Sequence, residues 1–273
     1  MSDISVGFVG LGAMGRPMAL NLHRAGLLTA AYNRSPGKTA ALAEETGVAA
    51  ASGLAELAQR VNAVVLCVPA DDDVLAAVET LTDSLAPGSF VIDCSTVAAA
   101  TAEAAAARLA ERGIGFLDCP VSGGTEGARA GTLSIMVGGE APLVERARPL
   151  LEAMGKSVVH LGPAGAGQAA KATNQVMVAG INQAVTEALA FGAASGLDLD
   201  KVIEVVGGGA AGNWFLDHRG HSMTRDSFEP GFRVALARKD LAICQQMAAQ
   251  HGVQLPMVEM TLVHYDRLLA EGY

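Results

Sequence analysis

The 273-residue chain is poor in aromatic side chains, in positive charge and in cysteine. Aromatic residues make up 4% of the sequence, so the hydrophobic core has to be built mostly from Ala, Val, Leu, Ile and Met. Lysine and arginine number 19 against 28 acidic residues, which gives a net charge of −9 at pH 7. A protein that binds the phosphate backbone of nucleic acids needs a basic face, so this balance argues against a nucleic-acid partner. It leaves room for one local cationic pocket that holds a small anion.

Cysteine and histidine show no spacing that would hold a metal ion. The four cysteines, none of them in a CxxC or CxxH pair, are Cys67, Cys94, Cys119 and Cys244. Three of them lie in strand-like runs of Val, Leu and Ile, which indicates buried, reduced thiols. His218 and His221 stand three residues apart without a third ligand nearby, so a solvated face is favoured over a zinc site. We expect no metal.

The sequence also lacks the signals of secretion and of membrane insertion. The N-terminal segment MSDISVGFVGLG has no basic stretch before its apolar residues and no cleavage site, so no signal peptide is predicted. No apolar run free of polar residues reaches about 18 residues, the length that a membrane helix needs. We therefore expect a cytoplasmic protein without a membrane partner.

Short apolar runs alternate with helical stretches through the first half of the chain. The expected strands are residues 5–11, 28–33, 63–69, 89–95, 115–121, 133–139 and 157–162. The expected helices between them include residues 16–25, 36–46, 53–60, 71–84 and 98–112. This alternation is typical of βαβ units, in which helices cover both faces of a parallel sheet.

The pattern changes near residue 163, beyond which no strand signal stands out. The expected helices here are residues 167–195, 198–206, 234–251 and 256–270. The sequence therefore predicts an α/β fold with a Rossmann-type, doubly wound sheet in residues 1–162. An all-helical domain for substrate binding and dimerisation is predicted in residues 163–273, beginning with the long interdomain helix 167–195.

A dinucleotide fingerprint stands at the start of the chain. Residues 10–15, GLGAMG, fit the pattern G-x-G-x-x-G between a strand-like run and a helical one. In that setting Gly10 makes the tight turn, Gly12 lets the pyrophosphate approach the backbone, and Gly15 lets the helix pack on the strand. The alternative is a glycine-rich turn without a ligand. The predicted cofactor-binding residues of this loop are Gly10, Leu11, Gly12, Ala13, Met14 and Gly15.

The end of the second strand bears on which dinucleotide is bound. NAD enzymes carry a carboxylate there for the ribose 2′-hydroxyl, and this chain has the neutral Asn33 instead. Arg34, Ser35 and Lys38 would hold a 2′-phosphate by charge-assisted hydrogen bonds, which favours NADP. The alternative is a solvated Arg34 that stacks on adenine, an arrangement that NAD would tolerate.

Lys171 lies in GAGQAAKATNQ, a run that otherwise reads as a buried helix. Burying an ammonium is costly unless the group is paired or discharged. In a dry cleft beside an oxidised, positively charged nicotinamide, the pKa of this lysine would fall, which suits proton transfer. Asn174 shares its helix face and would orient the lysine or hold a substrate oxygen. The alternative is a lysine whose ammonium reaches water.

Two further segments suit a ligand, although each also has a plainer interpretation. Ser122, Gly123 and Gly124 offer a hydroxyl and successive backbone N–H groups, a nest that binds carboxylates; the alternative is an ordinary turn. Thr96 follows a predicted parallel strand, where ligands bind in open α/β sheets, and it would equally cap the following helix.

Three other features receive structural interpretations. Trp214 and Phe215 are expected in the core rather than in a pocket. The acidic run at residues 71–73 is expected to cap a helix that begins near Val74, and Met257 and Met260 are expected in the core.

Five blocks in register resemble the β-hydroxyacid dehydrogenase family, which includes 3-hydroxyisobutyrate dehydrogenases, tartronate semialdehyde reductases and glyoxylate/succinic semialdehyde reductases. The blocks are VGFVGLGAMGRPMALNL at 6–22, DCST at 93–96, DCPVSGGTEGARAGTLSIMVGG at 118–139, GAGQAAKATNQ at 165–175 and PGFRVALARKDL at 230–241. The likeness covers nearly the whole chain. The chain stops at Tyr273, where family members usually continue with a short tail, and this affects only the expected edge of the domain.

The resemblance implies a role for each matching residue. Lys171 corresponds to the catalytic lysine, which acts as general acid and base. The implied substrate-binding residues are Ser122, Gly123, Gly124, Asn174, Phe232 and Asp240. The implied cofactor-binding residues beyond the glycine loop are Asn33, Arg34, Ser35, Lys38, Val68, Pro69, Thr96 and Lys239.

The expected function is hydride transfer between NADP(H), with NAD possible, and a short 3-hydroxy acid or its semialdehyde. The partners expected are a small carboxylate-bearing substrate and further copies of the chain, as a homodimer or homotetramer. An imine reductase shares the fold but normally lacks a lysine at position 171, and 6-phosphogluconate dehydrogenase has a longer helical domain. A non-catalytic NADP(H) sensor would not need Lys171, Asn174 and Ser122 together. Nothing in the sequence specifies the substrate's side chain.

Overall fold

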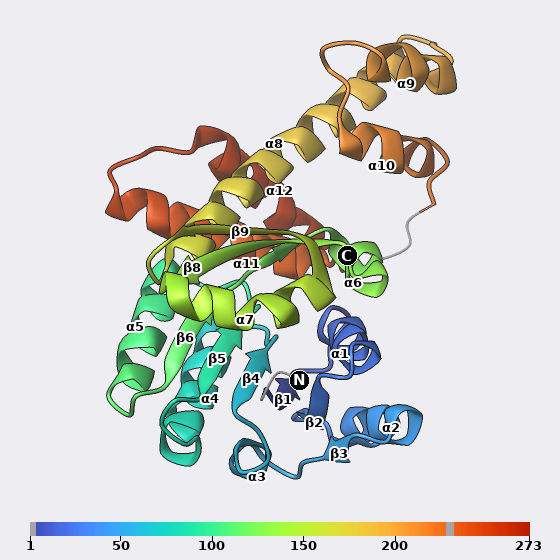
Figure 1. The fold of residues 1–273 in the computed structure, drawn as a ribbon. Helices are drawn as coiled ribbons and strands as arrows, with labels where there is room; N and C mark the ends of the chain where they lie inside the picture. Colours follow the sequence, from blue (N-terminus) through green and yellow to red (C-terminus); the bar gives the residue numbers. More distant parts are fainter. Residues whose placement is uncertain (1–3, 228–231) are drawn as a thin grey trace. The chain divides into compact units, whose positions relative to one another are not determined.

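A computed structural model describes residues 4–227 and 232–273 of the chain (Figure 1). The chain divides into two compact units, Met1–Lys171 and Ala172–Tyr273. The division falls inside the long helix α8 (Ala166–Ala194), so the first unit keeps the beginning of that helix. The assignment of cofactor binding to residues 1–162 and of substrate binding to residues 163–273 stays a prediction.

The first unit is built on a nine-stranded sheet with the order β3-β2-β1-β4-β5-β6-β8-β7, in which β9 also pairs with β8. The strands are β1 (Val6–Val9), β2 (Leu28–Tyr32), β3 (Ala49–Ala50), β4 (Ala63–Leu66), β5 (Phe90–Asp93), β6 (Gly115–Asp118), β7 (Val121–Ser122), β8 (Leu133–Gly139) and β9 (Gly155–Gly162). From β3 to β6 all neighbours run parallel, and the order reverses direction between β1 and β4. Such a switch point is where open α/β sheets bind ligands.

The far side of the sheet departs from the expected parallel arrangement. The run predicted as one strand at 115–121 is interrupted at Pro120 and forms β6 and β7, and β8 runs antiparallel to both. Between β6 and β8 the chain holds only β7 and the seven-residue helix α6 (Gly124–Ala130). A parallel crossover usually needs a longer helix, so the chain turns back instead.

Helices cover both faces of this sheet, which confirms the doubly wound architecture (Figure 1). One core cluster packs under α1 (Gly15–Arg24), α2 (Pro36–Thr46), α6 and α7 (Ala141–Met154). The other packs under α3 (Leu54–Ala58), α4 (Asp71–Ser84) and α5 (Ala99–Ala110). Alternate residues of one strand serve the two clusters: Phe8 belongs to the first and Val9 to the second.

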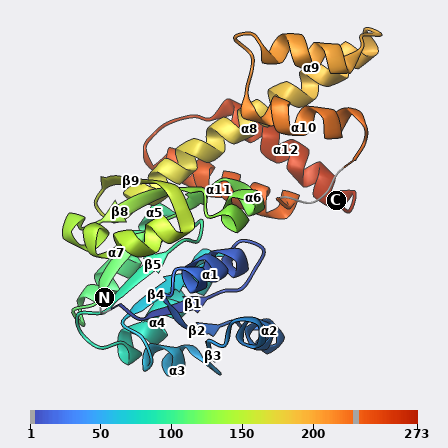
Figure 2. The same cartoon turned by 45° about the vertical axis from the view of Figure 1, so that its right-hand side comes forward.

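The second unit is helical throughout its described residues. It contains the rest of α8 with α9 (Leu199–Gly207), α10 (Trp214–Thr224), α11 (Val234–Gln250) and α12 (Pro256–Ala270). A small cluster joins the first half of α8 to α11 and α12, and a second joins its later half to α9 and α10 (Figure 2). The predicted fold class, a Rossmann-type domain followed by helices, is thus confirmed.

Helix α8 is long and apolar enough to cross a membrane by length and composition, with a hydropathy of 1.3 over its most apolar 18-residue window. This is weak evidence, because the central helix of many proteins passes the same test. In that window 22% of the residues are buried, and the side chains of Met177 and Phe191 are 63% and 75% exposed.

Several structural interpretations of the sequence were wrong. Trp214 is 56% exposed and stacks on His218 with ring centroids 4.3 Å apart, whereas Phe215 does pack against a buried cluster. Met260 is 46% exposed rather than in the core. Asp71 makes no capping bond to its own helix; its carboxylate accepts hydrogen bonds from Ala98 N–H and from the Thr101 hydroxyl at the start of α5.

Candidate active site

The glycine loop between β1 and α1 is shaped by two close approaches and one open space. Gly10 has φ of 95°, and a Cβ there would lie 2.2 Å from the carbonyl oxygen of Cys67. A Cβ on Gly15 would lie 1.9 Å from the carbonyl oxygen of Gly10. No atom lies within 4 Å of a Cβ placed on Gly12. The first and third glycines therefore serve packing, and the second leaves the backbone open to a ligand.

The N–H groups of this loop are divided between the protein and a possible ligand. Leu11 N–H donates to the side chain of Asn33 at 2.8 Å. Among the hydrogen bonds of the described residues, none is donated by the N–H of Gly12, Ala13 or Met14. These groups lie at the N-terminus of α1, where the helix dipole favours an anion, so the loop fits a pyrophosphate.

The segment after β2 places three exposed polar residues beside the loop. The side chain of Asn33 links this segment to the glycine loop. Its Oδ1 accepts a hydrogen bond from Leu11 N–H, and its Nδ2 donates to the carbonyl oxygen of Ser35 at 3.1 Å. Arg34, Ser35 and Lys38 are all exposed. The Arg34 guanidinium forms an ion pair with Asp73 of α4 at 3.2 Å, so this arginine is held near the start of that helix.

The segments that follow β4 and β5 are tied to each other. Val68 N–H donates to the Ser95 hydroxyl at 2.9 Å, which holds Val68 and Pro69 beside the segment that contains Thr96. The N-cap residue of α5 is Ala98, and its N–H is satisfied by Asp71. Thr96, which is half-buried, is therefore not the cap of that helix.

Lys171 is 8% exposed, and its Nζ donates a hydrogen bond to the carbonyl oxygen of Val121 at 2.9 Å. Val121 directly precedes Ser122, so the structure brings the predicted lysine next to the predicted carboxylate nest. Gly123 and Gly124 have φ of 128° and 61°, conformations that few side chains allow. The Ser-Gly-Gly turn therefore depends on glycine at both positions.

Asp118, at the end of β6, holds the start of the lysine helix. Its carboxylate accepts hydrogen bonds from Gly165 N–H at 2.8 Å and Gln168 N–H at 2.9 Å. A Cβ on Gly167 would lie 2.6 Å from the carbonyl oxygens of Asp118 and Met136, so the helix begins in direct contact with the strand ends. The position of Lys171 follows from this anchorage.

Two buried carboxyls lie side by side at this edge of the sheet. Asp93 and Asp118 are paired across β5 and β6. Burial raises the pKa of Asp93 to about 6, and burial also raises the pKa of Asp118, although backbone N–H groups oppose that shift. One oxygen of Asp93, Oδ2, has no hydrogen-bond partner. Burial likewise raises the pKa of the Cys94 and Cys119 thiols, which therefore stay protonated.

In the second unit, four polar side chains form a chain of contacts. Asn174 donates to Gln175 at 2.9 Å, and Gln175 donates to Asp240 at 2.8 Å. Asp240 is 4% exposed and also pairs with Lys239 at 3.2 Å. Phe232, the remaining predicted residue here, is 55% exposed, and its neighbours at 230–231 lie outside the described residues.

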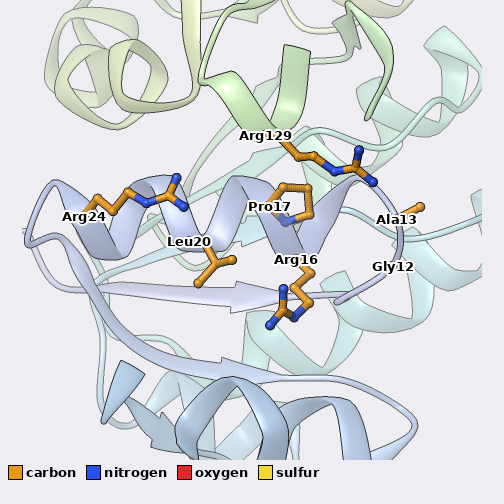
Figure 3. Close-up of a pocket in the computed structure, with 7 residues that line it drawn as sticks. All are labelled: Gly12, Ala13, Arg16, Pro17, Leu20, Arg24 and Arg129. Carbon is orange, nitrogen blue, oxygen red and sulfur yellow. The ribbon is translucent and has the colours of Figure 1, made fainter. Parts of the chain in front are cut away.

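A pocket of about 320 Å³ lies along the outer face of α1 (Figure 3). Gly12 and Ala13 of the glycine loop line one end, and Arg16, Arg24 and Arg129 supply guanidinium groups around it. Arg16 pairs with Glu45, so the local charge is positive but partly compensated. In a chain of net charge −9, this is a basic patch beside the loop that fits an anion.

Comparisons with known proteins follow the two halves of the chain. Residues 5–162 match the family described as the NAD binding domain of 6-phosphogluconate dehydrogenase. Residues 165–273 match the family described as the NAD-binding domain of NADP-dependent 3-hydroxyisobutyrate dehydrogenase.

Whole-chain relatives agree with this pairing. An NAD-dependent L-serine dehydrogenase of Pseudomonas aeruginosa is 38% identical, over 98% of this chain and 93% of its own length. A 2-hydroxy-3-oxopropionate reductase of Escherichia coli is 37% identical, over 98% and 92%. The chain belongs to the β-hydroxyacid dehydrogenase family.

A solved family structure shares the fold in detail. The 3-hydroxyisobutyrate dehydrogenase of Mycobacterium tuberculosis, determined with L-serine, has a TM-score of 0.89 and 33% identity, over 98% of this chain and 94% of that one. This β-hydroxyacid dehydrogenase is thus an NAD(P)-dependent oxidoreductase of small hydroxy acids. Among its described residues, no group of three His, Cys, Asp or Glu side chains is placed to hold a metal ion.

The sequence reasoning missed three residues that surround the predicted ones. Asp118 anchors α8, Gln168 contacts the segment around Thr96, and Gln175 joins Asn174 to Asp240. All three lie inside the blocks that resemble the family. A polar residue in an otherwise apolar, buried run was the available signal, the same signal that singled out Lys171.

Proposed function

We propose that this enzyme is an NADP-preferring dehydrogenase of a short 3-hydroxy acid, which also reduces the matching semialdehyde. The observation that carries the proposal is the buried Lys171, whose Nζ lies 2.9 Å from the carbonyl oxygen of the residue before Ser122. The proposed proton-transfer group thus lies next to the proposed carboxylate nest, which suits a 3-hydroxy acid because its hydroxyl-bearing carbon is only two bonds from its carboxylate carbon.

Lys171 is proposed as the general acid and base. In the reducing direction it donates a proton to the carbonyl oxygen of the semialdehyde, and in the oxidising direction it accepts the proton of the hydroxyl. The nicotinamide of the bound cofactor supplies or receives the hydride. Before and after the proton transfer, the carbonyl oxygen of Val121 would hold the Nζ of Lys171 in place.

The substrate carboxylate is proposed to bind Ser122, Gly123 and Gly124 through the hydroxyl and the backbone N–H groups. The relatives support a 3-hydroxy acid, because L-serine, 2-hydroxy-3-oxopropionate and 3-hydroxyisobutyrate all carry an oxygen on the carbon two bonds from the carboxylate carbon. In the second unit, Asn174, Phe232 and Asp240 are proposed to bind the substrate. Asp240 would act with Gln175, which links it to Asn174.

The preference for NADP is proposed from the segment after β2. Its exposed cations Arg34 and Lys38 and the neutral Asn33 favour a 2′-phosphate over a bare 2′-hydroxyl. Val68, Pro69, Thr96 and Lys239 are proposed to contact the cofactor with the residues of the glycine loop. The ion pair between Arg34 and Asp73 opposes this preference in part, because Asp73 and the phosphate compete for the same guanidinium.

The reaction is tested by oxidation of NADPH and of NADH in the presence of glyoxylate, succinic semialdehyde, tartronate semialdehyde and methylmalonate semialdehyde. L-serine and 3-hydroxyisobutyrate test the oxidising direction. We expect turnover of tartronate semialdehyde or methylmalonate semialdehyde with NADPH, because these two are reduced to 3-hydroxy acids, whereas glyoxylate gives a 2-hydroxy acid and succinic semialdehyde a 4-hydroxy acid. A protein that binds NADPH but turns over none of them would contradict the proposed substrate class.

Cofactor preference is tested with Arg34→Ala. Loss of one charge-assisted contact with the 2′-phosphate should raise the Kd of NADPH by about tenfold and leave that of NADH unchanged. Asp73→Asn is the matched variant, since it frees Arg34 and should tighten NADPH binding. Equal effects of Arg34→Ala on both cofactors would show that Arg34 contacts adenine instead.

A homodimer or homotetramer is also proposed, from the uncovered apolar side chains of the second unit. Phe191 and Met177 of α8 and Val263 of α12 are 75%, 63% and 67% exposed. A second copy is the partner that would cover such a surface. Phe191→Asp should shift the sedimentation coefficient toward the monomer, whereas Leu75→Asp, at an exposed leucine in α4, should not. An unchanged sedimentation coefficient for Phe191→Asp would remove α8 from the interface.

A further inference from the structure

The side-chain amide of Gln168 bridges the backbone on both sides of Thr96. Its Nε2 donates to the carbonyl oxygen of Ser95 at 2.9 Å, and its Oε1 accepts from Val97 N–H at 3.2 Å. Gln168 is 1% exposed. The amide thus pairs with the segment as a neighbouring strand would, and it satisfies two buried backbone groups at once.

This contact extends to a second cofactor segment. The Ser95 hydroxyl accepts a hydrogen bond from Val68 N–H, so the segment after β5 is joined to the one after β4. The backbone of Gln168 is itself held by Asp118 at the end of β6. One turn of α8 is therefore bonded, directly or through Ser95, to the carboxyl ends of three adjacent parallel strands.

Lys171 lies three residues after Gln168 on the same helix, a rise of about 4.5 Å. Gln168 contacts the backbone on either side of Thr96 through its side chain, whereas Asp118 holds only the backbone of the helix. Asp118 therefore sets where the helix begins. Gln168 sets the distance between that helix and the backbone at Thr96, which is proposed to contact the cofactor.

We propose that Gln168 is a positioning residue that fixes Lys171 relative to the cofactor segments at Thr96 and Val68. The proposal rests on the proposed role of Lys171 as acid and base. Hydride and proton transfer occur together only when the reacting atoms are aligned, and a displacement of about 1 Å can lower the rate by about 10²-fold. Gln168 reaches neither reacting group, so it acts on the rate of the chemical step through alignment.

Gln168→Met tests this directly, because methionine fills a similar volume and removes both hydrogen bonds. We expect kcat to fall by about 10²-fold, with KM and the Kd of NADPH within about threefold of wild type. The deuterium isotope effect on kcat, measured with NADPH deuterated at C4, should rise because hydride transfer becomes more strongly rate-limiting.

Asn62→Leu provides the matched control at the opposite, amino ends of the strands. The Asn62 side chain accepts Ser5 N–H at 2.9 Å, so it too is an amide that bonds the backbone of another segment. Both variants should lower the melting temperature. Only Gln168→Met should change kcat per folded molecule and the isotope effect, since Asn62 lies at the amino ends of the strands.

Gln168→Glu adds a readout that a purely structural role would not give. A protonated glutamic acid can still accept from Val97 and donate to Ser95, whereas the carboxylate would face the Ser95 carbonyl oxygen with a second acceptor. The ionisable groups on the elements packed around it are Asp93 and Asp118 on the sheet, Asp71 on α4, Glu103 on α5 and Lys171 on α8. The activity of Gln168→Glu relative to wild type should therefore rise as the pH falls, and that of Gln168→Met should not.

The outcomes separate this inference from the proposed function. If Gln168→Met keeps the wild-type kcat and isotope effect while Lys171→Met is inactive, the positioning role is wrong and the lysine's role stands. If Lys171→Met is active, the proposed function itself fails. Equal losses in kcat for Gln168→Met and Asn62→Leu would show that Gln168 contributes only to folding and has no positioning role.

Discussion

The two units of this enzyme differ in how completely they cover their large apolar side chains. The first encloses polar groups within a well-covered sheet: Asp93, Asp118, Gln168 and Lys171 are all less than 9% exposed. The second also buries polar groups, Gln175 and Asp240, but its apolar clusters are small and it leaves large apolar side chains such as Phe191 and Val205 about three-quarters exposed. Buried polar groups are costly and specify a single arrangement, whereas uncovered apolar surface gains by association.

Helix α8 shows this difference within one element. Its first residues, up to Lys171, belong to the first unit and carry buried polar side chains. Beyond Gln175 its exposed residues are mostly small or apolar, as Met177 and Val178 are. The beginning of the helix thus carries the groups of the proposed active site, and the remainder carries apolar side chains of the surface that is proposed to bind a second copy.

The largest predicted effect contrasts a glycine from each unit. Gly15→Ala should destabilise the enzyme by about 3 kcal/mol or more, because the new Cβ would lie 1.9 Å from a backbone oxygen. Gly180→Ala in α8 would meet only the flexible end of Met257 at 3.2 Å, and alanine favours the helix by about 1 kcal/mol. Urea unfolding of both variants measures the contrast. Equal destabilisation would mean that the second unit is packed as tightly as the first.

The next prediction concerns buried Asp93, which makes the stability of the first unit depend on pH. Burial raises the pKa of Asp93 from 3.8 to about 6 in the folded chain. The folded state therefore holds a proton that the unfolded state releases, so the free energy of unfolding falls as the pH rises from about 4 to about 6. The loss amounts to roughly 2–3 kcal/mol and is complete above the folded pKa.

Asp93→Asn should remove this contribution, because asparagine resembles the protonated acid and can still accept Ser95 N–H. The stability difference between the variant and wild type should grow in favour of the variant as the pH rises from 4 to 7. Exposed Asp83→Asn serves as the control and should show no such growth. A difference that stays constant across this pH range would mean that Asp93 is ionised throughout.

The smallest predicted effect concerns the basic patch beside the glycine loop. Arg129→Glu reverses one charge of the pocket on α1 without touching the loop itself. The association rate of NADPH should fall by a few-fold at low salt, and the difference should disappear near 0.5 M salt. Arg112→Glu, at an exposed arginine after α5, is the control. A rate independent of salt in both variants would exclude steering by this patch.

Much of the first unit could be predicted from the sequence because its signals are local. The strands are short apolar runs between turn residues, and the glycine loop lies where its fingerprint places it. The departures arose where pairing depends on distant residues. The two-residue β3, the turn back at Pro120 and the antiparallel β8 are set by which strand edge is available, which no local pattern encodes.

The candidate site was predictable in its main residues but not in its supports. Lys171 and Ser122 were found from residue type and resemblance, and the structure adds that Val121 joins them. Gln168, Asp118 and Gln175 act through partners 47 to 73 residues away, so only the fold shows what they contact. Trp214 is exposed because its neighbour Phe215 packs against the buried cluster while the indole stacks on His218, and residue type alone does not tell the two aromatic side chains apart.

The most direct test of the account is single-turnover hydride transfer by Lys171→Met with NADPH already bound. Lys156→Met, at an exposed lysine of β9, is the matched control. The account predicts a rate lower by about 10²–10⁴-fold for Lys171→Met, with unchanged NADPH binding and a control equal to wild type. A Lys171→Met enzyme that transfers hydride within about threefold of the wild-type rate would show that this lysine is not the proton donor.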